Sequence, residues 1–337
     1  MQLPFISVIL PVRNEEKYIT ACVASIFSQD YPADLMEVIF VDGRSEDRTV
    51  AMLHEMQKEH PQIVVLDNPN RTVPYAMNIG IAASRGKYIV RLDAHADYTQ
   101  DYISKCVHYL DTTDADNVGG VADTKSNGFI GNAVAKMLSS KFGVGNSQFR
   151  TGGDSGYVDT VPFGAFRREV FSNYGGYDER LVRNQDNEMN YRIRKNGGKI
   201  YLSSDIHLTY YCRDSIKAIA KMARLNGMWN VITMKLCPGA MGIRHFIPLA
   251  FVLSLIGLGA LSFLHPVFAM LLGAELALYL TLDILFSFRQ AEGFAQGALL
   301  MILFPIFHIS YGCGSLMGIC KLFSKEYRRG SYMPKKI

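Results

Sequence analysis

The C-terminal third of this chain is dominated by long stretches without charged side chains. Phe246–Leu264 has none in nineteen positions, and Ala298–Cys320 has none either. Nineteen helical residues rise about 28 Å, close to the hydrocarbon thickness of a bilayer. A third stretch, Val267–Phe288, is also long enough, but its Glu275 and Asp283 must face a protein partner or the membrane interface. The sequence therefore predicts about three transmembrane segments and a membrane-associated protein.

The last apolar stretch has features that compete with a simple membrane span. It contains Pro305 and several glycines, which are also typical of a broken or re-entrant helix. Three full crossings would place a basic C-terminal segment outside the cell, against the positive-inside tendency. Its basic residues are Lys321, Lys325, Arg328, Arg329, Lys335 and Lys336. We expect a multi-pass protein of the cell membrane with a cytoplasmic C-terminus. This requires either two crossings plus a re-entrant segment, or that the number of membrane helices is miscounted.

A basic amphipathic helix is predicted just before the apolar tail. Ser215–Thr233 places apolar residues at helical spacing among Lys217, Lys221 and Arg224. Such a helix can lie along an anionic membrane leaflet, although an ordinary surface helix has the same pattern. Its position before the tail favours the membrane interface.

The first two hundred residues have a different character. From Phe5 to about Ile206, short β-branched runs alternate with helical patterns, which predicts parallel strands under helices and a doubly wound α/β domain. The predicted strands are Ile6–Val12, Val38–Val41, Ile63–Leu66, Lys87–Leu92 and Lys199–Leu202. The predicted helices include one that starts at Ser45 as its N-cap, and Gly164–Tyr174 and Asp186–Asn196. The Gly-rich segment 119–161 reads as loops around a cleft, with a helix only at 129–142.

Composition excludes some classes of function. The net charge of +4 is too small for a nucleic-acid-binding surface, so no nucleic-acid partner is expected. Six scattered cysteines without a CxxC pair indicate reduced thiols, and the N-terminal apolar run lacks a basic leader, so it is interpreted as a buried strand. The α/β domain should therefore remain in the cytoplasm.

Carboxylates follow two of the predicted strands. Asp42 ends the second strand, and in an open α/β sheet this edge forms the ligand crevice, where a carboxylate can accept hydrogen bonds from a base or ribose. Asp93 and His95 follow the fourth strand, and such ligands can hold a divalent cation on substrate phosphates. A solvated turn is the alternative interpretation of the D-x-H pattern.

Asp186 lies in the first turn of a predicted helix. A carboxylate there often does no more than stabilise the helix dipole, as Glu188 also does. A general base would occupy the same position in the helix, but its carboxylate would also have to reach into the cleft. Both interpretations stay open from the local pattern alone.

Taken together and in order, these motifs resemble family 2 glycosyltransferases of the GT-A fold, and several resemble the succinoglycan-type exopolysaccharide branch. The family motifs are Ser7–Glu15, Val41–Gly43 with Ser45 and Asp47, Ala76–Gly80, Asp93–His95 and Gln185–Asp186. The branch motifs are Val158–Arg168, Gly175–Arg180 and His308–Gly312. The resemblance covers essentially the whole chain.

The resemblance assigns roles to individual residues. Pro11, Arg13, Glu15, Asp42, Asn78 and Asp93 would bind the nucleotide-sugar donor. Asp93 and His95 would hold Mn²⁺ or Mg²⁺, with His207 as a further metal ligand, and Asp186 would be the catalytic base. Gly152, Gly153 and Asp154 are the candidate acceptor-binding residues.

The expected activity is inverting transfer of a sugar from a nucleotide diphosphate, most readily UDP, to a polyprenyl-diphosphate-linked glycan. The Q-x-x-R-W signature of processive synthases is missing at Ala223–Trp229, which favours a single addition. Transfer to a polyprenyl monophosphate and a catalytically inactive nucleotide-sugar-binding scaffold are the alternatives.

This resemblance also divides the chain into parts. A GT-A domain at 1–211 would be followed by an interface helix and linker at 212–244, a transmembrane region at 245–322 and a basic tail at 323–337. The oligomeric state is not predicted by any of these features.

Overall fold

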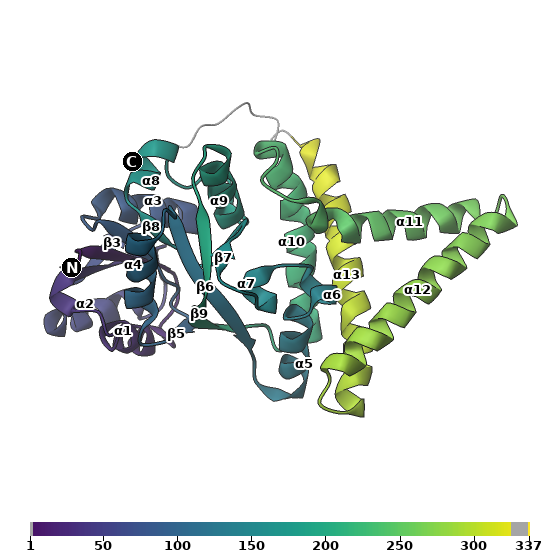
Figure 1. Cartoon of the computed structure of the whole chain (residues 1–337), viewed down its shortest axis with the longest axis horizontal. Helices are drawn as coiled ribbons and strands as arrows, with labels where there is room; N and C mark the ends of the chain where they lie inside the picture. The colour runs from purple at the N-terminus through teal and green to yellow at the C-terminus, as the bar shows by residue number, and fades with distance from the viewer. Residues whose placement is uncertain (1–2, 325–335) are drawn as a thin grey trace. The chain divides into compact units, whose positions relative to one another are not determined.

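The computed structural model describes residues 3–324 and 336–337, and much of the predicted basic tail, residues 325–335, lies outside them. The chain forms two compact units (Figure 1). Of the described residues, 3–123, 152–210 and 336–337 form the α/β unit, and 124–151 and 211–324 form the helical unit. Residues 124–151, which interrupt the α/β unit in sequence, therefore belong with the C-terminal helices.

One mixed sheet organises the α/β unit. Its order is β3-β2-β1-β4-β8-β6-β9-β5, with β7 paired to β9. The strands are β1 (Ile6–Val12), β2 (Met36–Asp42), β3 (Ile63–Asp67), β4 (Tyr88–Arg91), β5 (Ala96–Tyr98), β6 (Asn117–Lys125), β7 (Gly156–Tyr157), β8 (Ala165–Arg167) and β9 (Ile200–Tyr211). β1 to β4 are parallel, as their buried β-branched runs predict, whereas β4–β8, β6–β8, β5–β9 and β7–β9 pair antiparallel.

Helices connect these strands. They are α1 (Ile19–Phe27), α2 (Thr49–Glu59), α3 (Val73–Ala83), α4 (Tyr102–Thr112), α8 (Glu169–Tyr174) and α9 (Gln185–Lys195), with a 3₁₀ turn at Ala33–Leu35. The predicted helix start at Ser45 is wrong, because α2 begins at Thr49. The Ser45 hydroxyl instead donates to Asp42, while the Asp47 carboxylate accepts from the Thr49 amide.

The antiparallel half of the sheet corrects two further predictions. Ala165–Arg167, predicted as the start of a helix, is the short strand β8, which pairs with buried β4. The segment predicted as loops begins with β6, whose glycines allow close strand packing. A Cβ atom at Gly120 would collide with the backbone of Ile206 on β9, so glycine here serves a tight approach within the sheet.

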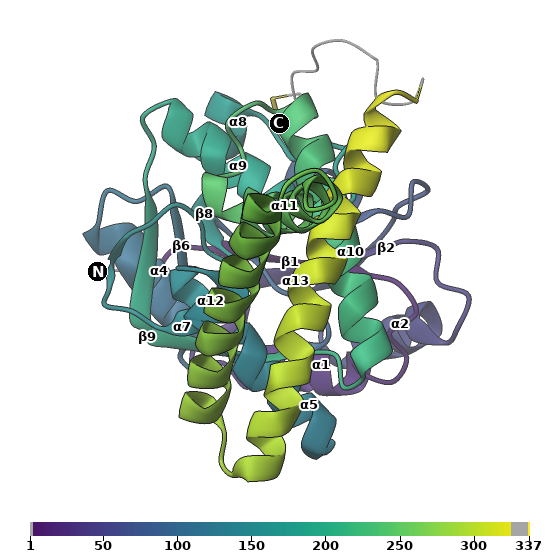
Figure 2. The same cartoon turned by 90° about the vertical axis from the view of Figure 1, so that its right-hand side faces the viewer.

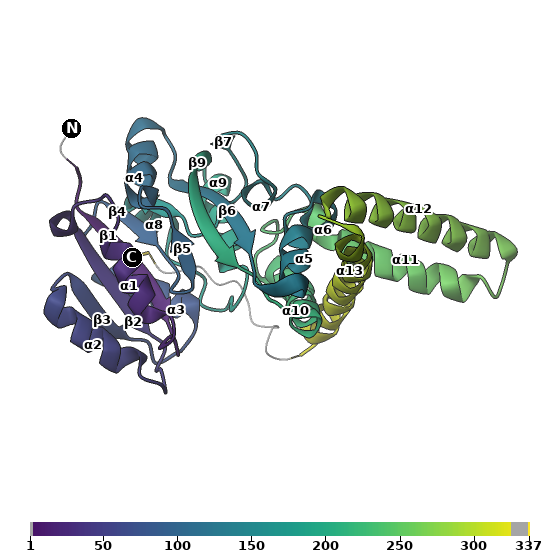
Figure 3. The ribbon, with the colours of Figure 1, turned by 90° about the horizontal axis from the view of Figure 1, so that it is seen from below.

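The helical unit consists almost entirely of α-helices. They are α5 (Gly128–Leu138), α6 (Lys141–Val144), α7 (Gln148–Thr151), α10 (Ile216–Leu236), α11 (Ile247–Leu261), α12 (Pro266–Gln290) and α13 (Phe294–Leu322), with a 3₁₀ turn at Ile243–Phe246 before α11. Among the described residues, three helices are long and apolar enough to cross a membrane, namely Ile243–Leu261, Pro266–Gln290 and Phe294–Leu322. These apolar helices mark the protein as membrane-associated. Figure 3 shows α11 and α12 as a hairpin that extends away from α13.

The predicted interface helix packs closely on α13. The α10 residue Gly227 lies against the Tyr311 carbonyl, and Gly314 of α13 lies against the Arg224 carbonyl, so a Cβ atom at either glycine would collide with backbone. The Ser315 hydroxyl donates to the Gly227 carbonyl over 3.2 Å. Small residues at a helix crossing allow this close approach.

Candidate active site

The carboxyl ends of three parallel strands bring the predicted donor residues to one edge of the sheet. In register, Val12 of β1 faces Asp42 of β2, and Ile9 of β1 faces Arg91 of β4. The chain therefore leaves β1 and β2 at one level, and Asp93 follows two residues after β4 ends. This is the edge at which open α/β sheets bind ligands.

Asp42 is held rigidly at the end of β2. Its carboxylate is almost completely buried and accepts from the Ser45 amide at 3.0 Å and the Ser45 hydroxyl at 2.5 Å. The same hydroxyl accepts from the Asn14 amide at 2.8 Å, which ties the loop after β1 to the loop after β2. A Cβ atom at Gly43 would lie 3.2 Å from the Arg71 carbonyl oxygen and 3.4 Å from the Arg13 Cβ, so this turn is closely packed between the two residues. Half-buried Pro11 lies on β1, just before this loop.

The segment after β4 is fixed from two sides. The Asp93 amide donates to the Tyr98 hydroxyl over 2.8 Å, and Tyr98 belongs to β5. The His95 Nδ1 atom lies 3.5 Å from the Glu15 Oε1 atom, which links this segment to the loop after β1. Glu15, Asp93 and His95 therefore occupy the same strand edge as Asp42.

Arg91 brings Asp93 and Asp186 together, although they are distant in sequence. The guanidinium Nη1 atom bonds to Asp186, and its Nη2 atom lies 3.7 Å from the Asp93 carboxylate. The Arg91 side chain is only 4% exposed, so both carboxylates compensate a buried cation. Sequence analysis did not identify Arg91. A charged residue inside an otherwise buried strand, Tyr88–Arg91, was the available signal.

Asp186 is accessible despite this buried partner. It lies in the first turn of α9, after Asn184, whose φ of 61° is left-handed and redirects the chain into the helix. The Asp186 side chain is 33% exposed. Desolvation raises the pKa of Asp186 above the usual carboxyl value, Arg91 opposes this shift and the negative charge of Asp93 adds to it. A carboxylate with an exposed edge and a raised pKa has the properties of a general base.

Asn78 has a structural role that its sequence motif does not indicate. Its Oδ1 atom accepts from the Tyr177 amide at 2.7 Å, and its Nδ2 atom donates to the Tyr177 carbonyl at 2.9 Å and to Glu179 at 3.0 Å. The side-chain amide thus holds α3 to the loop before α9. Because these bonds use both of its N–H groups, little hydrogen-bonding capacity is left for a nucleotide sugar. These bonds give Asn78 a structural role in that loop, and its assignment to donor binding stays a prediction.

Asn78→Ala is therefore expected to lower the free energy of unfolding by about 1–3 kcal/mol, because it leaves backbone groups of Tyr177 without their partner. Denaturant titration of the full chain in detergent measures this change. Nucleotide affinity of the folded fraction should be unchanged, and a large loss of affinity without destabilisation would place Asn78 in the donor site.

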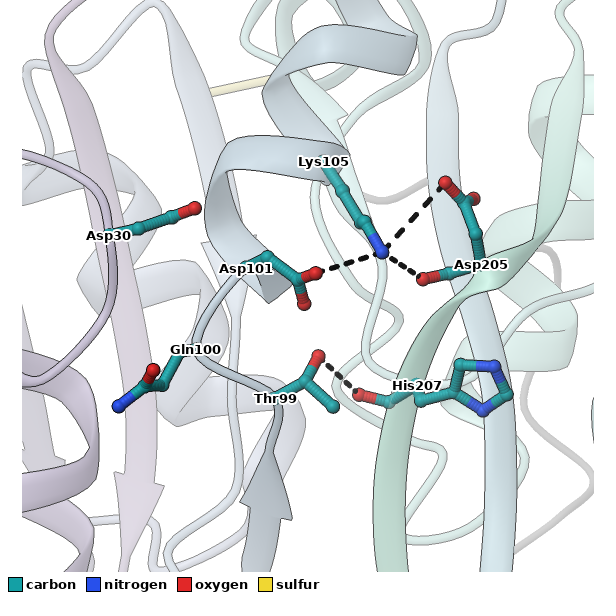
Figure 4. Close-up of a pocket in the computed structure, with 7 residues that line it drawn as sticks. All are labelled: Asp30, Thr99, Gln100, Asp101, Lys105, Asp205 and His207. Carbon is teal, nitrogen blue, oxygen red and sulfur yellow. Dashed lines mark hydrogen bonds and ion pairs between the residues drawn. The ribbon is translucent and has the colours of Figure 1, made fainter.

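His207 lies apart from the predicted metal ligands. It is on β9, where its carbonyl accepts from the Thr99 amide, and its Nδ1 atom lies 3.1 Å from Asp123. Figure 4 shows His207 at an open pocket of about 580 Å³, beside Thr99 and Lys105. Lys105 is paired there with Asp101 at 2.9 Å and Asp205 at 3.8 Å. The neighbours of His207 are thus different from those of Asp93 and His95, and we omit it from the metal site.

The candidate acceptor residues lie in an exposed turn. Gly152, Gly153 and Asp154 follow α7 and precede β7, and Gly152 has a φ of +74° that favours glycine. This turn is where residues 124–151 rejoin the α/β unit. Its role in acceptor binding stays a prediction.

The residues present fit a divalent cation only together with a substrate. Within residues 3–324 and 336–337, no three His, Cys, Asp or Glu side chains gather as a metal site. Asp93 and His95 alone supply one carboxylate and one imidazole at the strand edge. Mg²⁺ and similar ions are commonly held by one or two protein ligands plus substrate phosphates and water, which matches this incomplete set.

The fold and the carboxylates at its strand edge define a glycosyltransferase of the GT-A type. The chain is similar in structure to the mannosyltransferase PcManGT from Pyrobaculum calidifontis, solved in complex with GDP-Man and Mn²⁺. The TM-score is 0.64 at 19% identity, and the match covers 94% of this chain and 88% of that chain. At this identity the similarity shows the fold.

Sequence comparison identifies the family. The model described as "Glycosyl transferase family 2" matches residues 7–175, and the chain belongs to this family. It is 29% identical to a dolichyl N-acetyl-α-D-glucosaminyl phosphate 3-β-D-2,3-diacetamido-2,3-dideoxy-β-D-glucuronosyltransferase from Methanococcus voltae, over 94% of this chain and 98% of that protein. It is also 31% identical to the succinoglycan biosynthesis protein ExoA from Rhizobium meliloti, over 61% of this chain and 63% of that protein.

Proposed function

We propose that this enzyme transfers one sugar, with inversion, from a nucleotide diphosphate to a lipid-linked glycan during assembly of an exopolysaccharide or capsule. The shared contact of Asp93 and Asp186 with Arg91 is the observation that carries the proposal. Asp93, expected to serve the diphosphate, and Asp186, expected to serve the acceptor, contact the same guanidinium, which supports a sugar bound within reach of both carboxylates.

Asp186 acts as the general base in this mechanism. It takes the proton from an acceptor hydroxyl as that oxygen attacks the anomeric carbon, and the bond from this carbon to the diphosphate oxygen breaks on the opposite face. One displacement of this kind inverts the anomeric configuration. The exposed edge of Asp186 gives the acceptor access, while Arg91 holds the carboxylate in place.

The nucleotide occupies the edge formed by β1 and β2. Asp42 accepts hydrogen bonds from the base, with Pro11, Arg13 and Glu15 around it. Asp93 and His95 hold Mn²⁺ or Mg²⁺, which would neutralise charge on the leaving diphosphate. We propose a UDP-sugar as donor.

The acceptor is a polyprenyl-linked glycan at the cytoplasmic membrane face. The name of the Methanococcus relative describes a dolichyl-phosphate-linked sugar as acceptor, and the chain covers almost all of that protein. The apolar helices support a substrate that resides in the membrane. The turn at 152–154 is our candidate for contacting the sugar of this acceptor.

A donor screen tests the proposal. Purified full-length enzyme is combined with a panel of nucleotide sugars, membrane lipid extract and Mn²⁺ or Mg²⁺, and nucleotide release and labelled lipid are measured. We expect release with one UDP-sugar that depends on lipid extract containing a lipid-linked glycan. Product formed on polyprenyl monophosphate alone would assign the enzyme to lipid priming instead, and donor binding without turnover under all conditions would support the scaffold alternative.

A further inference from the structure

Contacts within the helical unit identify which apolar helices are covered by protein. Residues 124–151 and α10 precede the first apolar stretch in the chain, so they lie on the side from which the chain enters the membrane. The segment 124–151 is joined at both ends to strands of the α/β unit, β6 and β7, by short connections. Any helix that packs against these segments along its length must stay on that side.

The first half of α13 packs against residues 124–151. Just before it, Glu292 forms a 3.0 Å ion pair with Lys136 of α5. Phe142 of α6 packs on Phe304 with ring centroids 5.0 Å apart, and its carbonyl lies 3.0 Å from the His308 Nε2 atom. The start of α13 is therefore on the entry side.

The second half of α13 packs against α10. Gly314 contacts the backbone of Arg224, and Gly318 contacts Met228 and Val231. The α10 helix carries Lys217, Lys221, Arg224 and Lys235, too many charges for a hydrocarbon environment. Both halves of α13 thus lie beside charged segments on the same side of the membrane.

The exposed side of α13 fits a membrane surface. Ile302, Ile309 and Met317 are exposed, and their spacing of seven and eight residues places them on one helical face. The polar residues Gln296, His308 and Ser315 are buried on the other side. An apolar stripe backed by a protein-covered face is the pattern of a helix that lies in the interface plane.

The half of the α11–α12 hairpin near its tip lacks protein cover, whereas the other half contacts α6 and α13, for example through Tyr279, whose hydroxyl lies 2.8 Å from the His308 Nδ1 atom. Val252 is the only buried residue of α11, and only Asp283 and Ser287 are buried in α12. From Val252 to Leu261 the first helix rises about 14 Å, and from Pro266 to Tyr279, where α12 meets α6 and α13, the second rises about 20 Å. Both lengths are less than a hydrocarbon core of about 30 Å. Figure 2 shows α11 end-on beside the length of α13, so α11 projects across the direction of α13.

The tip of this hairpin is apolar. Phe263 and Leu264 are 91% and 77% exposed, and no charged residue occurs between Arg244 and Glu275. A tip that emerged into water would expose these two side chains. Glu275, the first charge, accepts from the Ser254 hydroxyl at 2.5 Å inside the hairpin.

We propose that only α11 and α12 enter the bilayer, as a re-entrant hairpin that leaves on the side it entered, while α13 lies along the membrane surface. The lipid bilayer is the occupant that covers the hairpin. This arrangement keeps Lys321 and the end of α13 on the membrane side from which the chain enters, in agreement with the positive-inside tendency. It replaces the predicted multi-pass topology with a monotopic one.

Cysteine labelling of the full-length protein in membrane vesicles of both orientations tests this topology. Single cysteines are introduced at Asp154, Leu264, Gly293 and Ser324 in a background with Cys237, Cys313 and Cys320 replaced by alanine, because the other cysteines are buried. We expect a membrane-impermeant maleimide to label positions 154, 293 and 324 from one side. Position 264 should react only after detergent is added.

Each other pattern overturns the proposal. Labelling of position 264 from the opposite side shows a crossing hairpin, and labelling from the same side as 154 shows a hairpin outside the bilayer. Opposite labelling of 293 and 324 shows that α13 crosses. Size exclusion of each variant in detergent verifies folding, and the cysteine-depleted parent gives the background.

A separate observation concerns Arg91. Phe163, which has a φ of 44°, places its ring 5.6 Å from the Arg91 guanidinium carbon, and its carbonyl accepts from the Tyr102 hydroxyl at 2.8 Å. A buried guanidinium enclosed in this way cannot turn to solvent. The planar guanidinium fork restrains the Asp186 carboxylate through Nη1, while its Nη2 atom lies 3.7 Å from Asp93, so the group sets the position of Asp186 relative to Asp93.

We infer that Arg91 is a positioning residue for Asp186, an inference that rests on the proposed function. Arg91→Lys keeps the charge without the fork, and Arg91→Met removes both. We expect kcat to fall between about 10- and 100-fold for Lys and further for Met, as small misplacements of a reacting group do. The KM for the donor and UDP affinity by calorimetry should change little.

The controls separate this inference from the function itself. If both Arg91 variants keep the parental kcat per folded molecule while Asp186→Asn is inactive, the positioning role is wrong and the function stands. If Asp186→Asn is fully active as well, the proposed function fails. A thermal melt gives the unfolded fraction of each variant. If kcat falls only in proportion to that fraction, Arg91 serves structural support and not positioning.

Discussion

Asp186→Asn is expected to lower kcat by at least about 10²-fold, the usual contribution of a general base. The amide has nearly the same shape as the carboxylate and keeps an oxygen that accepts from Arg91, so the bond at this site is weakened rather than deleted. It cannot take a proton from an acceptor hydroxyl. Donor binding should persist, because Asp42 and its partner Ser45 are untouched. Single-turnover kinetics with the best donor measure the chemical step.

Asp159→Asn provides the matched control, since it removes an exposed carboxylate outside the strand edge. It should leave kcat unchanged. UDP affinity and the unfolding midpoint of both variants show whether lost activity reflects chemistry or structure. An Asp186→Asn enzyme with parental kcat, at parental UDP affinity, would remove this residue from the mechanism.

The parallel half of the fold was predictable because its signals are local. The runs of β1 and β2, Ile6–Val12 and Met36–Asp42, are long, rich in β-branched residues and buried, and each is followed by a helix. The positions of Asp42 and Asp93 follow from the strand ends alone. The antiparallel half depends on short pairings such as β4 with β8, which have no local period and appear only through tertiary contacts.

The candidate site was predictable in its carboxylates and not in the residue that joins them. Nothing in the spacing of Asp93 and Asp186 indicates a shared partner, because their convergence depends on how β4 and the start of α9 pack. Arg91 reads as the end of a strand until burial shows that it needs compensation. Asn78 illustrates the opposite case, where a residue in a family motif serves the loop around the site.

Apolar length alone also gave an incomplete view of the C-terminal helices. The stretch of α13 passes every criterion for a membrane span, yet much of its surface is buried against protein. Hydropathy does not distinguish burial in lipid from burial in protein, because both environments exclude water. The glycines that suggested a broken helix instead serve contacts such as Gly314 with Arg224.

Asp93→Asn is expected to lower kcat/KM by about 10²–10³-fold and to raise the Mn²⁺ or Mg²⁺ concentration needed for half-maximal rate. About 3–4 kcal/mol of charge stabilisation on the leaving diphosphate would be lost, about a factor of ten for each 1.4 kcal/mol. The fold should be retained, because Arg91 keeps its direct bond to Asp186. Cation titrations at saturating donor measure the shift, and calorimetry of Mn²⁺ binding in the presence of UDP gives a readout independent of turnover.

The matched control for Asp93 is Asp97→Asn, an exposed carboxylate four residues further along the same segment, on β5. Asp97→Asn removes one negative charge, as Asp93→Asn does, but Asp97 lies beyond the turn that carries Asp93 and His95. The cation concentration that this variant needs for half-maximal rate should therefore equal that of the parent.

His95→Ala should raise the cation concentration needed for half-maximal rate, as Asp93→Asn does, but by a smaller factor. The reason is that an exposed neutral imidazole attracts a hard cation less than a carboxylate does. If the parent, Asp93→Asn and His95→Ala all need the same cation concentration, the metal binds elsewhere. If Asp97→Asn raises the needed concentration as much as Asp93→Asn does, the effect reflects general electrostatics at the strand edge and not a metal ligand.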